Sequence, residues 1–300
     1  MEFWLATIIQ GLVFAIMALG VFITYKILDF PDLSVEGTFP LGASITAALI
    51  VKGVNPIVSI IFAFIGGAIA GFCTGFLNIK MKISNLLAGI LVMTGLYSIN
   101  LRVMGKSNIH LFEYKTIFDG FLPPIALLLI IVILIKIGMD LLLKTQFGVS
   151  LKALGDNPQL VRSLGISEDK IKFYGLMISN GLVCVSGAIY AQMQSFSDVG
   201  MGAGIIVAGL ASIIFGISIF KKIKFMKFTT MAILGSLLYR LCIGVALKLG
   251  LPAGDLKLVT VIIISLALGL KINPKKFRLK KLSFNKKINL VSRREGEVNA

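Results

Sequence analysis

The chain has 300 residues, of which 57% are hydrophobic and only 15% are charged, and its mean hydropathy is +0.94. This composition excludes a soluble globular domain and indicates a protein that crosses a membrane several times. The net charge of +16 does not favour a nucleic-acid-binding protein, because the basic residues lie in short connectors and in the C-terminal tail, as the positive-inside rule expects.

The first two segments differ in kind. Residues 3–24 carry no charge and are long enough to span a bilayer. Residues 25–51 are apolar only from Pro40 onward, which is too short to span alone. Pro31, Gly37 and Pro40 predict a broken helix preceded by irregular backbone. Such backbone is tolerated at membrane depth only where protein or water satisfies its polar groups, so this segment is a candidate part of a transport pathway.

The next apolar segment, residues 56–78, carries Gly67, Gly71 and Gly75 at four-residue spacing. This spacing lets another backbone approach closely, and we favour packing within the chain over a contact between subunits. The lysines at positions 80 and 82 then place the end of the segment in the cytoplasm. An outward crossing, a polar external loop and an inward crossing follow at residues 84–104, 105–120 and 121–139.

A polar stretch, residues 147–172, then interrupts the apolar segments and carries the signals of a short, rigid helix. Asn157 is a candidate N-cap, Pro158 suits the first helical position, and Gly165 suits the left-handed position after the helix. Ser167 is the expected N-cap of the next helix. From the residues alone, a cytoplasmic helix that a partner moves and an ordinary amphipathic connector both remain open.

The apolar residues of this short helix follow the i, i+3, i+4 rule, which places Leu160, Val161 and Leu164 on one face. Ile166 is expected to close a hydrophobic contact at the C-terminal end. The sequence therefore predicts one continuous apolar face on a helix that has no transmembrane role.

The second half of the chain repeats the alternation of apolar segments. Crossings are expected at residues 173–193, 205–220, 228–249 and 256–270, with a second broken region at 194–204 and a cytoplasmic lysine cluster at 221–227. The sequence thus predicts an all-α polytopic membrane protein with about eight to nine transmembrane helices, and nine crossings put the N-terminus outside. We expect a transmembrane domain over residues 1–271, with a cytoplasmic loop at 144–172, and a basic cytoplasmic tail over 272–300.

The two broken regions share a local pattern. Phe30–Asp32 and Phe196–Asp198 each follow an apolar helix and precede a glycine-rich run. Paired interruptions in two halves of a chain point to a transport site at a repeat interface. Five expected crossings separate the two regions, so the repeat would be inverted.

No catalytic machinery is recognisable in the sequence. The only phosphate-loop fragment is Gly105–Ser107, and Asn100 stands where a Walker A motif requires glycine. No nucleophile triad, catalytic carboxylate pair or zinc-binding helix is visible, so we expect no enzyme, no cofactor and no metal site. Cys73, Cys184 and Cys242 lie far apart in apolar runs and are expected to be packing residues.

Polar and ionisable groups at membrane depth are functional candidates, because burying a charge there is costly. Arg240 is the clearest, since it lies well inside residues 228–249 with apolar neighbours. It either pairs with a carboxylate, Asp198 or Asp32, or holds the carboxylate of a solute, and we favour the structural pair. The pathway candidates are Asp32, Ser34, Glu36, Asn180, Asp198 and Arg240.

Several motifs resemble one family of transport proteins. The coupling loop of the ABC-importer permeases for branched-chain amino acids, ribose and related solutes is similar in spacing to Gly148, Ala153, Gly155, Asn157, Gly165 and Ile166. Gln10–Gly20 resembles the first helix of the branched-chain amino acid permeases, and Asp32–Val35 resembles a run in the sugar branch. The resemblance covers residues 10–270.

The resemblance implies a permease subunit in the cell membrane that works as a homo- or heterodimer with cytoplasmic ATPase subunits and an extracytoplasmic solute-binding protein. It implies that the loop docks on the ATPase through Gly155, Asp156, Asn157, Pro158, Leu160, Val161, Leu164 and Gly165. The expected partners are these proteins, a second permease copy and membrane lipid, but not nucleic acid.

Within the family, the sequence most resembles a branch predicted to transport amino acids, aromatic ones included. Glu36 stands where the sugar branch has glycine, and the cluster from Lys221 replaces a glycine-rich turn, so sugars and nucleosides remain alternative substrates. The competing class is an ion- or proton-coupled secondary transporter, with Asp32, Glu36 or Asp198 as the coupling group.

Overall fold

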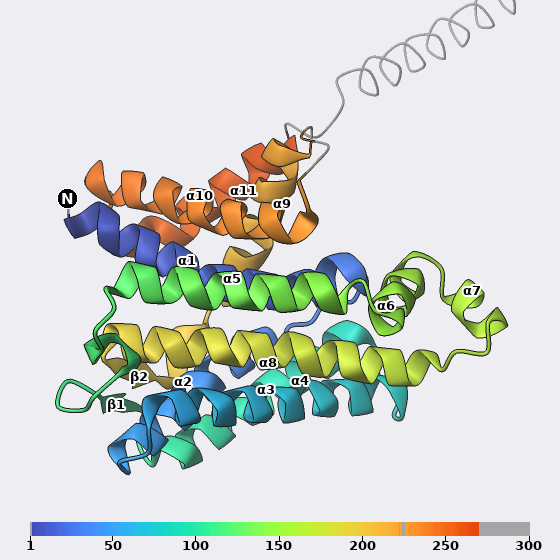
Figure 1. The fold of residues 1–300 in the computed structure, drawn as a ribbon, viewed down its shortest axis with the longest axis horizontal. Coiled ribbons are helices and arrows are strands. Elements are labelled where there is room, and N and C mark those ends of the chain that lie inside the picture. The colour runs from blue at the N-terminus through green and yellow to red at the C-terminus, as the bar shows by residue number, and fades with distance from the viewer. Residues whose placement is uncertain (1, 222, 224–225, 270–300) are drawn as a thin grey trace, which may run out of the picture.

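The structure is a computed structural model and describes residues 2–221, 223 and 226–269. In this part of the chain, long helices lie side by side along the longest axis of the molecule (Figure 1). The helices in chain order are α1 (Glu2–Phe22), α2 (Val35–Val51), α3 (Pro56–Ile79), α4 (Asn85–Met104), α5 (Pro124–Leu142), α6 (Gln146–Asp156), α7 (Pro158–Ser163), α8 (Glu168–Gln194), α9 (Ile205–Phe220), α10 (Phe228–Lys248) and α11 (Leu256–Gly269).

Shorter elements connect these helices. A π-helix, η1 (Ile23–Ile27), prolongs α1, and single 3₁₀ turns lie at η2 (Ile117–Asp119), η3 (Val199–Gly202) and η4 (Ala253–Asp255). Two short strands, β1 (Asn108–His110) and β2 (Phe196–Asp198), form an antiparallel pair in which Asn108 faces Asp198. The sequence did not predict these strands, because three residues are too few to show an alternating pattern.

The helices α1 and α8 form the middle of the molecule. α1 is buried at every residue from Gly11 to Phe22, and it contacts α8, α10 and α5. α8 also contacts α2 and α3 on its other side. In Figure 1, α9, α10 and α11 therefore lie on one side of this pair, and α2, α3 and α4 on the other.

Seven helices of the described part are long and apolar enough to cross a membrane, counting α1 together with η1 and α9 together with η3. α2 is apolar but has only 17 residues, and α11 runs to the edge of the described part. The predicted all-α polytopic fold is confirmed. The predicted nine crossings and the inverted repeat stay predictions, and the tail from residue 272 lies outside the described residues.

The prediction that Gly37 and Pro40 break the second segment is wrong. Both residues lie inside α2, and the break falls at residues 28–34 instead. Pro40 leaves the carbonyl of Glu36 without an intrahelical donor, and Gly202 lies so close to this oxygen that an added Cβ would come within 1.9 Å of it. Asn100 Nδ2 donates to the carbonyl of Gly37 at 3.2 Å. α2 therefore continues through two residues that would weaken an isolated helix, with η3 and α4 packed against it at these positions.

The glycine spacing on α3 serves packing within the chain, as favoured above. A Cβ at Gly67 would lie 2.4 Å from the carbonyl oxygen of Asn180, and one at Gly71 would lie 2.3 Å from that of Leu176. A Cβ at Gly75 would meet the ring of Phe173 at 2.8 Å. These glycines let α3 lie directly against the backbone of α8.

Candidate functional site

Three of the predicted pathway residues meet in one buried polar cluster between the irregular segment and α8. Asn180 Nδ2 donates to Asp32 Oδ2 at 2.8 Å, and its Oδ1 accepts from Ser34 Oγ at 3.1 Å. Thr38 Oγ1 donates to the same oxygen at 2.7 Å, and the backbone N–H of Ser34 donates to Asp32 Oδ1 at 2.9 Å. All four side chains are at most 2% exposed.

The cluster fastens the break in the chain to α8. Gly89 of α4 also approaches it, because a Cβ there would lie 2.7 Å from the backbone nitrogen of Leu33. The polar groups of an irregular segment at membrane depth must be satisfied by protein or water, and here protein satisfies the side chains of Asp32 and Ser34. Asp32, Ser34 and Asn180 therefore form a buried hydrogen-bonded contact between the irregular segment and α8, and do not line an open cavity.

Glu36 and Asp198 lie apart from this cluster, around η3. Glu36 Oε1 accepts from the backbone N–H of Gly204 at 3.1 Å, and Asp198 Oδ1 accepts from that of Gly200 at 2.7 Å. Glu36 also lines a cavity of about 350 Å³ together with Tyr97. The side chains of Asp32 and Asp198 each accept a hydrogen bond from the backbone N–H two residues further along the chain. The two broken regions therefore contain the same kind of turn, although Asp32 is buried and Asp198 is not.

The expected ion pair of Arg240 with Asp32 or Asp198 is not formed: among the described residues, no carboxylate lies within ion-pair distance of this arginine. Its guanidinium instead lies 3.6 Å from the ring centroid of Phe14, and its Nε is buried without a hydrogen-bond partner in the described part of the chain. Both carboxylates are already held by other donors, which is why neither is available to the arginine.

Arg240 thus faces an aromatic cluster formed by α1, α2 and α8. The ring of Phe14 lies edge-on to that of Tyr190 at 5.5 Å, and Phe39 lies 5.5 Å from Tyr190 and 6.0 Å from Phe14. Gln194 donates to the Tyr190 hydroxyl. A cation over an aromatic face is stabilised by the ring quadrupole, and a planar guanidinium with a spare donor is suited to a carboxylate. The sequence pattern predicted the arginine but not the rings around it.

The short helix between Asn157 and Gly165 forms as predicted. Asn157 Oδ1 accepts from the backbone N–H groups of Gln159 and Leu160, and Pro158 is the first residue of α7. Gly165 has φ +73°, its N–H donates to the Arg162 carbonyl, and the Ile166 N–H donates to the Val161 carbonyl. This pair of bonds is a Schellman C-cap.

The prediction of one continuous apolar face on α7 is wrong. Val161 is fully buried, whereas Leu160 is 49% and Leu164 is 64% exposed. Residues four apart stay on one side of a helix, but the residue next to them turns by roughly 100°. Val161 therefore anchors α7 to the protein, and Leu160 and Leu164 present an apolar pair to the outside.

The sequence analysis missed α6, the helix immediately before α7. Gly148, Leu151 and Leu154 lie on its buried face, and Thr145 caps its N-terminus. The spacing of these residues was a signal that could have found it. Gly155 lies against η1, because a Cβ there would come within 1.8 Å of the Ile27 carbonyl oxygen.

Comparison with known proteins gives one consistent picture. A family model described as the permease component of branched-chain amino acid transport systems matches residues 3–270. Over 255 residues, 85% of this chain and 86% of the relative, the sequence is 55% identical to the tyrosine transport system permease protein of Clostridioides difficile.

Two further relatives are more distant. The probable branched-chain amino acid transport permease protein LivH of Methanocaldococcus jannaschii is 28% identical over 206 residues, 62% of this chain and 65% of the relative. The nucleoside ABC transporter permease protein NupC of Lactococcus lactis is 31% identical over 186 residues, 59% and 53% of the two chains. No solved structure matches the chain.

Proposed function

We propose that the chain is the membrane subunit of an ATP-driven amino acid importer, because it belongs to the family of permease components of branched-chain amino acid transport systems. It is thus a multi-pass cell-membrane transport component and not an enzyme. Its proposed partners are cytoplasmic ATPase subunits, an extracytoplasmic solute-binding protein and a second permease copy. The buried part of α1, from Gly11 to Phe22, forms the centre around which the pathway opens and closes.

The observation that carries the proposal is that α6 packs on η1, at the end of α1, while α7 packs on α6 and α8. α7 is capped at both ends and exposes Leu160 and Leu164, which suits a rigid helix that docks into a partner. α6 meets the Ile27 carbonyl through Gly155, and η1 leads directly into the irregular segment bound to Asn180. A displacement of α7 is therefore passed to the break between α1 and α2 through backbone contacts.

We propose an aromatic amino acid as the solute. The 55% identity to a protein named as a tyrosine transport permease supports this substrate class over sugars and nucleosides. The arrangement of Arg240 over Phe14, beside Tyr190 and Phe39, suits a carboxylate and a planar ring. These side chains are packed together here, so solute would reach them only after the helices around them separate.

The coupling assignment is tested by Leu160→Asp combined with Leu164→Asp. Both side chains are exposed, so the variant should fold and insert, yet two carboxylates should prevent docking and abolish solute uptake. The measurement is co-purification with the ATPase and uptake in cells. The matched control, Gln159→Asp with Ser163→Asp, adds the same charge to exposed polar positions of the same helix. Normal uptake in the leucine variant would show that α7 is not the docking element.

A further inference from the structure

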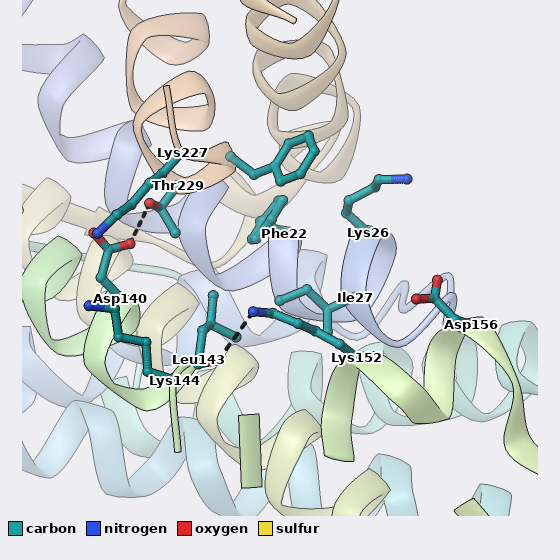
Figure 2. A pocket seen from close by; sticks show the side chains of 11 residues that line it. Phe22, Lys26, Ile27, Asp140, Leu143, Lys144, Lys152, Asp156, Lys227 and Thr229 are labelled. Carbon is teal, nitrogen blue, oxygen red and sulfur yellow. Dashed lines mark hydrogen bonds and ion pairs between the residues drawn. The ribbon is translucent and has the colours of Figure 1, made fainter. Parts of the chain in front are cut away.

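A cavity of about 560 Å³ opens where α1 and η1, the end of α5, α6 and the start of α10 meet (Figure 2). Its lining includes four lysines and two aspartates: Lys26, Lys144, Lys152, Lys227, Asp140 and Asp156. Its apolar wall includes Phe22 and Phe228, whose rings stack with centroids 6.5 Å apart. The coupling role proposed above does not use this cavity.

The positive charge of the cavity is only partly offset by its aspartates. Asp140 is 12% exposed and already accepts from Lys227 at 2.8 Å, from Thr229 at 2.6 Å and from Lys136, outside the cavity, at 2.9 Å. Figure 2 shows the first two of these donors beside it, and Lys152 donating to the Leu143 carbonyl. Asp140 therefore has little capacity left to neutralise the remaining lysines.

Two of the lysines are uncommitted within the part of the chain that the structure describes. The side chains of Lys26 and Lys144 are exposed and make no hydrogen bond or ion pair with any described residue. They come from different elements, η1 and the connector after α5, and line opposite sides of the cavity, where their ammonium groups point outward (Figure 2). Such an arrangement attracts an anion.

The apolar wall decides which kind of anion fits. Phe22 is buried, and Phe228 is 48% exposed at the start of a membrane-spanning helix. The lysines place this end of the bundle at the cytoplasmic membrane surface, where anionic lipids are available. A soluble anion would leave the aromatic wall unused, whereas an amphiphile would contact both parts.

We propose that this cavity binds the headgroup of an anionic phospholipid from the cytoplasmic leaflet, with Lys26 and Lys144 supplying positive charge from its two sides and the lipid chain along Phe228. The bound lipid joins α6 to the ends of three membrane-spanning helices. The proposal does not depend on the identity of the transported solute or on ATPase coupling.

The test is lipid retention by the purified full chain, measured by native mass spectrometry with phosphatidylglycerol and phosphatidylcholine offered together. Lys26→Gln combined with Lys144→Gln should reduce the preference for phosphatidylglycerol roughly thirtyfold, because each of the two lysines near a lipid surface contributes about 1 kcal/mol. Neither lysine has a partner within the described residues, so folding should be unaffected, which a thermal unfolding curve checks.

The matched control, Lys80→Gln with Lys82→Gln, removes the same charge from another cytoplasmic connector and should keep the preference. An equal loss in control and cavity variants, or no loss in either, would overturn the proposal. Inorganic phosphate serves as a soluble competitor and should leave phosphatidylglycerol bound. Displacement by phosphate would assign the cavity to a soluble anion and would equally contradict the lipid assignment.

Discussion

Asn180 uses both ends of its amide to hold the irregular segment, donating to Asp32 and accepting from Ser34 and Thr38. Because these groups are buried, replacing the amide with an apolar side chain leaves a carboxylate and two hydroxyls without this partner. We expect Asn180→Leu to lower the free energy of unfolding by roughly 3 kcal/mol or more.

The measurement for Asn180→Leu is thermal unfolding in lipid nanodiscs, with Thr94→Val as the control. Thr94 is exposed and donates only to the carbonyl of Ile90 in its own helix, so its loss should change stability little. Equal unfolding curves for the two variants would mean that the polar cluster contributes nothing to the fold.

Arg240 gives the opposite expectation for stability. No described carboxylate pairs with it, so Arg240→Met leaves no charge unpaired and removes a cation–π contact worth about 2 kcal/mol, together with the cost of a buried cation. We expect unfolding close to that of the unsubstituted protein, together with lost solute uptake. A loss of more than about 3 kcal/mol, restored by Asp32→Asn, would instead indicate a buried ion pair.

At the η1 end of the bundle, α6 and η1 pack through one close approach of their backbones. Gly155→Ala places a methyl group where the Ile27 carbonyl oxygen lies, so α6 must move away from η1. We expect the ATPase to bind α7 as before, while uptake falls roughly tenfold, since changes along a coupling route alter coupling by about 1 to 2 kcal/mol.

The control for Gly155→Ala is Gly138→Ala on α5, where an added Cβ meets no atom within 4 Å. Binding is measured by co-purification with the ATPase and coupling by uptake in cells. If both alanine variants transport normally, α6 can shift away from η1 without affecting uptake, and the contact with η1 does not transmit movement.

For the whole molecule, the energy source is the decisive question. Gly105 of the phosphate-loop fragment is the left-handed C-cap of α4, and such a fragment at the end of a helix cannot form the strand-to-helix turn that cradles phosphates. We expect the purified chain alone to show no ATP hydrolysis, and solute uptake in cells to survive a proton uncoupler while ATP is maintained.

The cellular measurement separates the two transporter classes. Uptake is followed with the uncoupler present and the ATP concentration measured in the same cells. Uptake that follows the proton gradient at constant ATP would favour a secondary transporter. Glu36 and Asp198 at the η3 end, and not the closed Asp32 cluster, would then be the groups to examine for proton coupling.

The sequence by itself determined the membrane class, most helix positions, the caps of α7 and the family, because these depend on local composition, spacing and motifs. Asn157, Pro158 and Gly165 act within a few residues of themselves, and their roles were predicted correctly. The number of crossings stays undecided, because the length of α2 alone does not show whether it spans the membrane.

Only the tertiary structure decided which partners the distant residues have. Asp32 meets Asn180 across 148 positions in the chain, Arg240 meets Phe14, and Gly202 lies against the Glu36 carbonyl of α2. The split between the buried Val161 and the exposed Leu160 likewise depends on what α7 packs against. A buried charge or carbonyl is satisfied by whichever group the fold brings to it, and local sequence carries no record of that neighbour.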